Sequence, residues 1–224
     1  MTNRMPHEAR TSARGPALDD DAALLSRLRA GDRAAFSLLV ARHSGSLLRV
    51  ALSFVRDRSV AEEVVQETWL GVLTGLAAFE GRSSLRTWLF GILVNKARTR
   101  FVREGRTVPF SALARSDQPE EATVDAARFD PGGSWRDPPS GWTEEDPERL
   151  AMRAEAQETI EAAIRKLPEA QRTVITLRDV EGLEAEEICN VLGITVTNQR
   201  VLLHRARAKV RQALEDRDRP GGRS

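Results

Sequence analysis

The sequence predicts an all-α protein built from two small helical domains that are joined by a long flexible linker. Apolar residues recur at three-to-four spacing through most of residues 19–104 and 147–215, and no stretch alternates as a strand would. Residues 105–146 lose this spacing and carry five prolines, a Gly-Gly pair and many acidic residues. Because loops of that length are uncommon inside one compact domain, the interruption indicates two domains rather than one.

Composition limits what the chain can do. The 224 residues carry a formal net charge of +1, so any affinity for nucleic acid has to come from local basic patches. A single cysteine, Cys189, excludes an internal disulfide framework and fits a reducing cytoplasm. The sequence shows neither a secretory signal nor an apolar run of membrane-spanning length, and we expect a cytoplasmic protein.

The sequence offers no sign of enzymatic chemistry. It has no phosphate-binding glycine loop, and its three histidines, His7, His43 and His204, lie in unrelated places without a set of neighbours that would hold a metal. We therefore expect no catalytic residues, no metal, no cofactor and no small-molecule substrate.

The first domain is predicted to be a series of helices that follows residues 1–18, which are polar and expected to be disordered. A short leucine-containing helix is expected to stop at Gly31, and Asp32 is placed to cap the next one. Further along, Ser59 and Glu62 have the spacing of a capping box at the start of a third helix.

A loop over residues 79–83 separates the third helix from a fourth, which is expected from about residue 84 to residue 103. The fourth helix has an apolar stripe that includes Trp88, and this tryptophan is predicted to pack in the core. The helix is also strongly basic, which makes it a candidate for contacts with nucleic acid. Its polar candidates are Arg86, Asn95, Lys96, Arg98, Arg100 and Arg103.

The second domain is predicted to start near Pro147, a favourable first-turn residue, and it contains a helix-turn-helix pattern between Glu181 and Arg211. Two short helical patterns meet at a break around Gly193, and the second is basic. A scaffold helix, a glycine turn and a basic helix are what entry into the major groove requires, so this segment predicts DNA binding. Residues 216–224 are predicted to be a disordered tail.

Within the basic helix, Thr195 is the expected N-cap, so the next residues would point at base edges and the later arginines would lie nearer phosphates. His204 is open to two interpretations, a phosphate contact or an exposed histidine without a role. Cys189, between the two helices, is predicted to be an inert packed thiol rather than a redox sensor. The candidate DNA contacts are Thr197, Asn198, Gln199, Arg200, His204, Arg205 and Arg207.

Separated blocks of this sequence together resemble the extracytoplasmic-function (ECF) sigma factors, the minimal members of the sigma-70 family of bacterial RNA polymerase initiation subunits. Residues 62–70 (EEVVQETWL) are similar to the family's polymerase-binding segment, and residues 79–89 (FEGRSSLRTWL) to its promoter-melting segment. Residues 95–98 (NKAR) follow where a family helix meets the −10 element. Residues 167–172 (LPEAQR) and the helix-turn-helix resemble the region that reads the −35 element.

The resemblance implies sigma region 2 over residues 19–104 and sigma region 4 over residues 147–215. It implies a transcription initiation factor that binds core RNA polymerase, directs it to specific promoters and aids promoter melting. The implied partners are the polymerase (its β′ coiled coil and its β subunit), promoter DNA and a controlling anti-sigma factor. A conventional helix-turn-helix regulator is the competing hypothesis, but it would not need a second DNA-facing helix far from its reader.

The resemblance also implies which residues of the first domain act. Glu62, Glu63, Gln66 and Glu67 would contact the β′ coiled coil; the alternative is a solvated helix face with acidic residues favoured by the helix dipole. Phe79, Arg82 and Ser83 would line a pocket that captures an unstacked base, although Phe79 is equally suited to be a core anchor. The remaining −10 contacts would be Arg86, Asn95, Lys96, Arg98 and Arg103.

One departure from the family concerns promoter choice. The family commonly shows a Gly-Thr-Val-Lys run at the start of the basic helix, whereas this chain has Thr-Asn-Gln-Arg at residues 197–200. Because the two amide side chains suit adenine edges, we expect a −35 preference that differs from the usual one.

Overall fold

The computed structural model describes residues 17–103 and 147–218, and every regular element in these two ranges is helical. The all-α prediction is confirmed for this part of the chain. The expectations for the first 16 residues, for residues 105–146 and for the last six residues lie outside it.

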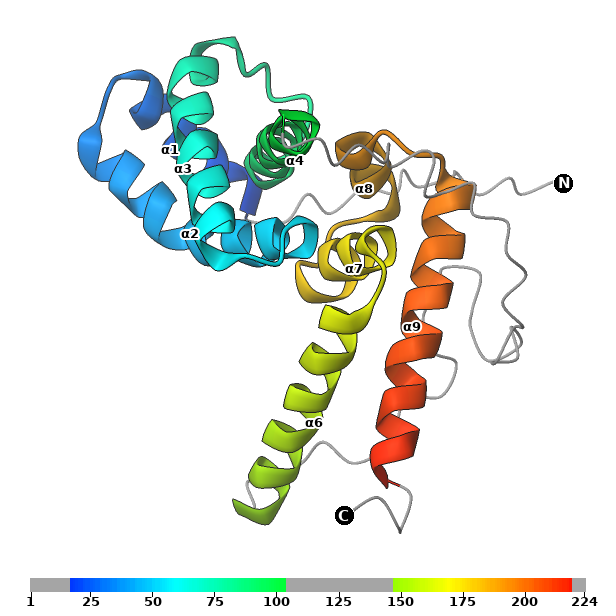
Figure 1. Ribbon diagram of the computed structural model, residues 1–224. Helices are drawn as coiled ribbons and strands as arrows, with labels where there is room; N and C mark the ends of the chain where they lie inside the picture. Colours follow the sequence, from blue (N-terminus) through cyan, green and yellow to red (C-terminus); the bar gives the residue numbers. More distant parts are fainter. Residues whose placement is uncertain (1–16, 104–146, 219–224) are drawn as a thin grey trace, which may run out of the picture.

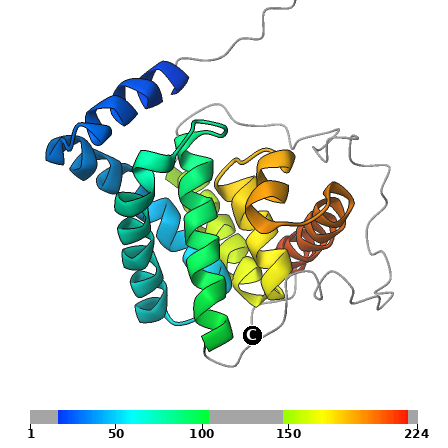
Figure 2. The ribbon, with the colours of Figure 1, turned by 90° about the horizontal axis from the view of Figure 1, so that it is seen from above.

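The first unit contains α1 (Ala17–Arg29), α2 (Arg33–Phe54), α3 (Arg58–Gly75), a short 3₁₀ turn η1 (Leu76–Ala78) and α4 (Leu85–Arg103). Helices α2, α3 and α4 pack against one another in pairs, and α1 packs on α2 (Figures 1 and 2). The buried face of α3 is the one that its apolar spacing predicts. It includes Ala61, Val65 and Val72, and Leu76 of η1 continues it.

The boundary between α1 and α2 follows the predicted signals. α1 ends at Arg29, and Gly31 then adopts a φ of 77°. The Asp32 carboxylate accepts hydrogen bonds from the backbone N–H groups of Ala34 at 2.9 Å and Ala35 at 3.1 Å. Asp32 is therefore the N-cap of α2, as predicted.

The start of α3 differs from the prediction. Its N-cap is Asp57, whose carboxylate accepts hydrogen bonds from the N–H of Ser59 at 2.8 Å and from its hydroxyl at 2.7 Å. Glu62 pairs with Arg58 at 2.8 Å and does not reach back to form a capping box. The aspartate takes the cap because its charged oxygen accepts both hydrogen bonds, whereas a serine hydroxyl is a neutral and weaker acceptor.

The second unit contains α6 (Pro147–Lys166), α7 (Glu169–Ile175), a π-helical turn η3 (Thr176–Val180), α8 (Ala185–Leu192) and α9 (Val196–Asp218). Helices α6 and α9 lie side by side and extend away from the rest of the molecule (Figure 1). Between α8 and α9, Gly193 has a φ of 60°, a left-handed conformation that glycine adopts without strain. The predicted helix-turn-helix is confirmed.

Two predicted boundaries need correction. α1 begins at Ala17, so residues 17 and 18 are helical rather than disordered. α9 continues through Asp218, three residues into the predicted tail. Side-chain pairs one turn apart favour this extension: Arg211 contacts Glu215 at 2.6 Å, and Gln212 contacts Asp216 at 2.9 Å.

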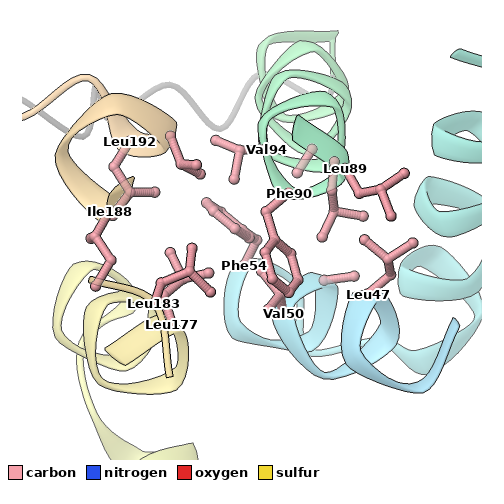
Figure 3. Packing of buried hydrophobic residues seen from close by; sticks show 14 of the residues in the cluster. Leu47, Val50, Phe54, Leu89, Phe90, Val94, Leu177, Leu183, Ile188 and Leu192 are labelled. Atoms are coloured by element: carbon pink, nitrogen blue, oxygen red, sulfur yellow. The ribbon is translucent and has the colours of Figure 1, made fainter. Parts of the chain in front are cut away.

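The two units share one hydrophobic core, which the sequence did not predict. Figure 3 shows Phe54 of α2 with Phe90 and Val94 of α4 on one side, and Leu183 and Ile188 of the second unit on the other. All of them are buried. Helix α4 packs on α8 and α2 packs on α7, so the two units meet face to face.

A buried arginine links the units at the edge of this core. Arg172 of α7 is only 6% exposed, and its Nε donates a hydrogen bond to the carbonyl oxygen of Ser53 at 2.8 Å. Ser53 lies in the last turn of α2, where carbonyl groups lack helical partners and a cation is favoured. Its hydroxyl also contacts the Thr173 hydroxyl at 3.1 Å. The second unit thus completes the C-terminal end of α2.

Candidate nucleic-acid interface

The first turn of α9 carries the residues that were predicted to read bases. The backbone N–H of Asn198 donates to Oγ1 of Thr195 at 3.2 Å, which agrees with the prediction that Thr195 caps this helix. Thr197 and Arg200 are exposed and Asn198 is half-buried. The exposed side chains of this turn, Thr197 and Arg200, are therefore accessible at the start of the helix.

Gln199 does not share this exposure. Its side chain is 2% exposed and ranks among the fully buried ones. It lies three and four residues before Leu202 and Leu203, on the face of α9 that packs against α7 and α8. In this arrangement Gln199 is a core residue, and the expected contact with an adenine edge does not fit its position.

The Arg207 side chain also forms its contacts within the protein. Its Nε donates to Oδ2 of Asp179 at 2.9 Å and its Nη2 donates to Oδ1 at 2.6 Å. Its side chain is 17% exposed, and the pair joins α9 to η3. The expected phosphate contact of Arg207 does not fit this role. Arg205 and His204 are half-buried on the same helix.

Two valine side chains on α9 are exposed at the surface of the helix. Val196 and Val201 are 41% and 42% exposed. Val201 falls one residue after Arg200 and four after Thr197, which places the three on one helix face. This spacing could have indicated from the sequence that Val201 shares a face with Thr197 and Arg200. An apolar residue in a basic helix, however, is normally assigned to the core. On a helix that enters the major groove, a valine can contact a thymine methyl group.

The loop before α4 holds the residues predicted to capture a base. Phe79 is 6% exposed and its ring lies 4.7 Å from that of Trp88, centroid to centroid. Arg29 of α1 holds the start of the loop, because its Nη2 donates to the Phe79 carbonyl oxygen at 2.5 Å. Arg82 and Ser83 are exposed. The core-anchor alternative therefore describes Phe79, while Arg82 and Ser83 remain accessible.

The predicted contacts on α4 divide between open and covered positions. Asn95 is exposed and Lys96 is half-buried. The side chain of Arg103, at the end of the helix, lies outside the described part. Arg86 and Arg98 face the second unit and form hydrogen bonds with residues of that unit.

Arg86 and Arg98 bind groups at opposite ends of α8. Nη2 of Arg86 contacts Oε2 of Glu181 at 2.8 Å, shortly before the helix starts. Nη2 of Arg98 donates to the carbonyl oxygen of Leu192, the last residue of the helix. Burial lowers the pKa of the Arg98 guanidinium. A side of α4 that the resemblance assigns to DNA is thus covered by the scaffold helix of the helix-turn-helix.

Glu181 is the centre of the charged contacts between the units. Besides Arg86, its Oε1 accepts from Nε of Arg49 on α2 at 2.8 Å, and the carboxylate is 1% exposed. Burial acts to raise the pKa of Glu181, but hydrogen bonds from Arg49, Ser46 and Arg86 outweigh it, and the net pKa is lowered. The carboxylate is therefore held ionised between two helices of the first unit.

The acidic face of α3 is accessible but partly paired. Glu63 contacts Arg100 of α4 at 2.5 Å, and Glu67 lies 3.9 Å from the same guanidinium. Gln66 is exposed, and beyond it the same helix exposes two leucines. Leu70 is 63% exposed and Leu73 is 55% exposed. The face thus changes from acidic to apolar along the helix, and the two leucines are absent from the predicted contacts.

Membrane spanning, metal binding and thiol chemistry have little support in the described residues. No helix among them is long and apolar enough to span a membrane, and no three of their His, Cys, Asp and Glu side chains cluster as metal ligands would. Burial, with a contribution from Glu186, raises the pKa of the Cys189 thiol. A raised pKa disfavours the reactive thiolate, in agreement with the prediction of an inert thiol, but Cys189 is half-buried and not fully packed between the helices as expected.

Comparison with known proteins gives two family matches. Residues 39–107 match sigma-70 region 2, and residues 157–210 match sigma-70 region 4. The chain is 34% identical over 197 residues to the RNA polymerase sigma-H factor of Pseudomonas aeruginosa, across 88% of this chain and 95% of that protein. It is 32% identical over 190 residues to the ECF RNA polymerase sigma-E factor of Escherichia coli K12, across 85% and 92% of the two chains.

Two solved structures are similar to this chain over most of its length. The chain is similar to CnrH in its complex with the cytosolic domain of CnrY, with a TM-score of 0.52 and 27% identity over 89% of this chain and 99% of that one. It is also similar in fold to the sigma factor RpoE of Bartonella quintana, solved with the anti-sigma factor NepR. That match has a TM-score of 0.53 and 22% identity, over 82% of this chain and 98% of that one.

Proposed function

The chain belongs to the ECF group of the sigma-70 family, whose members direct RNA polymerase to promoters, and we propose that it divides each promoter between two surfaces. The first turns of α9 read the −35 element, while α4 and the loop before it bind the −10 element. The factor has no catalytic chemistry of its own, since its family is not enzymatic.

The −35 contacts that we propose are the accessible residues of α9. Thr197 and Arg200 are exposed, and Asn198 and Arg205 are half-buried beside them. Arginine suits guanine edges and asparagine suits adenine edges, so this set can discriminate bases. His204 is half-buried rather than exposed, and a phosphate contact from it stays a prediction. Gln199 and Arg207 are left out because their side chains are engaged inside the domain.

The −10 contacts that we propose are Arg82, Ser83, Asn95 and Lys96, joined by Arg86 and Arg98 once these are released from the second unit. Removing a base from the DNA stack costs a few kcal/mol of free energy. Polar contacts to the base edge and stacking on a side chain offset this cost. Because Phe79 is buried, the accessible groups for such a base are the exposed Arg82 and Ser83. Phe79 would act by fixing the loop.

The face of α3 is the surface that we propose for core polymerase. Glu62, Glu63, Gln66 and Glu67 offer acidic and amide groups to a basic β′ coiled coil, and the exposed Leu70 gives it an apolar anchor. The pairing of Glu63 with Arg100 is partly exposed, with the Glu63 side chain 54% exposed, so a stronger partner can replace it.

One observation carries the proposal: a single chain presents two separate basic helices and an accessible acidic helix face. The test is run-off transcription with purified core polymerase on a promoter library, with and without the factor. We expect transcripts from promoters that share −10 and −35 sequences, only when the factor is present. Tight binding to duplex DNA by the factor alone, without transcripts, would instead support the conventional regulator.

We also propose that an anti-sigma factor controls this chain. The support is the RpoE relative of the same fold, which was solved with such an inhibitor. A tagged copy purified from its own cells should carry a second protein that blocks run-off transcription when it is added back. A copy that is always recovered alone, or with polymerase only, would contradict this part of the proposal.

A further inference from the structure

The loop that the proposed function assigns to base capture is held at its start by a residue of α1. Nη2 of Arg29 donates a hydrogen bond to the carbonyl oxygen of Phe79 at 2.5 Å. Arg29 is the last residue of α1, and this helix packs on both α2 and η1. Helix α1 precedes the residues that match sigma-70 region 2, which begin at residue 39. The start of the loop therefore depends on a helix outside that match.

The carbonyl group of Phe79 lies where the chain needs a hydrogen-bond donor. The N–H of Phe79 donates to the carbonyl oxygen of Leu76 at 3.3 Å and closes η1, so its own carbonyl group lies just beyond the end of this turn. Carbonyl groups at a helix end lack partners within the helix, and a cation there also interacts favourably with the helix dipole. The guanidinium of Arg29 supplies both the donor and the charge.

The side chain of Phe79 is held from a second direction. Its ring is buried and lies 4.7 Å from the ring of Trp88, centroid to centroid. The indole ring in turn lies against Gly75 of α3, where an added Cβ would be only 3.3 Å from Cζ2 of Trp88. The missing side chain of Gly75 thus lets this ring lie close to α3. The backbone and the ring of Phe79 are therefore fixed by groups from α1, α3 and α4.

The other end of the loop is held by the start of α4. Oγ of Ser84 accepts a hydrogen bond from the N–H of Thr87 at 3.1 Å, as the side chain of a helix N-cap does. Between Phe79 and Ser84, residues 80–83 are exposed, and Gly81 turns the chain with a φ of 72°. The loop is thus a short exposed tip between two fixed ends.

We infer that Arg29 is a positioning residue for promoter opening, which holds the loop of residues 79–83 in the conformation that receives an unstacked base. This inference rests on the proposed function. A base that leaves the stack costs free energy, and a loop that has to be ordered on binding adds an entropic cost. Fixing Phe79 in advance removes part of the second cost. In this role Arg29 does not contact DNA and acts through Phe79.

Arg27 provides a matched control on the same helix. It lies two residues earlier, and its guanidinium contacts Oδ2 of Asp32 at 2.8 Å. Arg29→Met and Arg27→Met make the same change in charge, and methionine has nearly the helix propensity of arginine. Only Arg29→Met removes the hydrogen bond to Phe79. Both arginines are exposed, so neither change alters the core, and circular dichroism establishes that both variants are folded.

The mobility of the loop in the free factor tests the contact itself. Gly81 lies within the exposed tip, and its backbone amide can be followed by nitrogen relaxation in glycine-labelled protein, which reports motion on the picosecond to nanosecond scale. Arg29→Met should lower the heteronuclear Overhauser effect of Gly81, and Arg27→Met should leave it at the value of the parent. Equal values in the parent and in Arg29→Met would show that Arg29 does not hold the loop.

The rate of promoter opening is the functional measurement, on a promoter selected in the run-off library. With saturating holoenzyme, Arg29→Met should form open complexes on duplex DNA about tenfold more slowly than Arg27→Met. When the same promoter is premelted across its −10 element, the base is already out of the stack, and the two variants should start transcription equally fast. A loss that is equal on both templates would identify a merely structural role and overturn the inference.

The same assay distinguishes failure of this inference from failure of the proposed function. If the parent factor and core polymerase yield transcripts from neither template, the proposed function is wrong, and the role of Arg29 in opening is wrong with it. If the parent opens the duplex promoter and Arg29→Met opens it at the same rate, only the inference about Arg29 is wrong.

Discussion

At the scale of single residues, exposure separates the side chains of α9 that can meet DNA from those that hold the domain together. Arg200 is exposed at the first turns of the helix. Arg207, two turns later, pairs its guanidinium with Asp179, and Gln199, the residue before Arg200, is buried. Three polar residues of one basic helix thus have different roles.

Arg200→Ala should weaken −35 binding and relax the preference at one base position. If Arg200 makes a bidentate contact with a base, the loss is about 1–3 kcal/mol on the preferred sequence and smaller on others. Selection from a randomised −35 library with holoenzyme measures this. An equal loss on every sequence, together with a smaller salt dependence, would identify Arg200 as a phosphate contact instead.

Val201→Ser should change base preference without changing the salt dependence of binding. If Val201 contacts a thymine methyl group, removing its two methyl groups costs about 1 kcal/mol at that base and little elsewhere. The same library selection, compared with Val196→Ser as a matched exposed valine, gives the position. An unchanged selected sequence would remove Val201 from the reading surface.

The roles of these residues could be predicted only in part. The spacing of Gln199 to Leu202 and Leu203 already places it on the inner face, and helical phase alone would have found this. The role of Arg207 could not be found, because Asp179 lies 28 residues away and the pairing depends on how α9 crosses η3. Exposure of Val201 likewise depends on which face the second unit buries.

At the scale of helices, α3 and α9 each combine a packed face with one left accessible. The accessible face of α3 is the clearest candidate for a protein partner, because its acidic residues are followed by two exposed leucines. The accessible part of α9 is short, because beyond its first turns the helix is engaged with α6 and α7.

Gln66→Lys on α3 should weaken assembly with core polymerase. A basic side chain placed against a basic coiled coil adds repulsion, and we expect affinity to fall by about tenfold while the melting temperature stays unchanged. Glu80→Lys, a charge change at an exposed loop position, is the control. Fluorescence titration of labelled factor with core polymerase measures both. Equal affinities for the two variants would return this face of α3 to the status of a solvated surface.

Asp179→Asn should lower stability without altering how binding to DNA depends on salt. The amide retains one hydrogen bond to Arg207 but loses the charge, and we expect a loss of about 1 kcal/mol in the free energy of unfolding. Urea unfolding and the salt slope of −35 binding are the two measurements. A changed salt slope would mean that Arg207 contacts phosphate after all.

Helix identity was predictable from the sequence, whereas the helix ends were predictable only where one signal stood alone. Gly31 and Asp32 gave the start of α2 correctly. At α3 two residues competed for the cap, and the charged Asp57 took it from Ser59. α9 continued past its predicted end because pairs such as Arg211 and Glu215 favour another turn.

At the scale of the whole molecule, the main feature is the core shared by the two units. The sequence indicated two domains because residues 105–146 interrupt the helical pattern, and that interruption carries no information on whether the flanking units touch. From the sequence alone, the apolar residues of α4 could all be assigned to the core of their own domain. Only the structure shows that Phe90 and Val94 lie opposite a different domain.

The free energy of unfolding should fall as the pH is lowered, and Glu181 should account for part of the fall. Its pKa is lowered in the folded chain, so its stabilisation is fully present above the ordinary value of 4.5 and is lost as the pH falls through the lowered pKa. His43, whose pKa is lowered by burial and by Arg42 and Arg86, begins the decline below its ordinary value of 6.5.

Urea unfolding between pH 7 and pH 3.5 measures this dependence. Glu181→Gln should flatten the acidic part of the curve, because it removes one group whose pKa is lowered on folding. Glu169, whose pKa is raised by burial, acts in the opposite direction and is present in both proteins. Parallel curves for the two proteins would show that Glu181 is not held ionised by its partners.

The shared core also bears on how the chain is made. The first unit leaves the ribosome before the residues that cover Phe54, Phe90 and Val94 have been synthesised. At bacterial elongation rates, the stretch from residue 104 to Leu192 takes roughly 5–20 s to produce. For that interval the side chains of the first unit that face the shared core lack their C-terminal partners, so the nascent chain exposes an apolar surface.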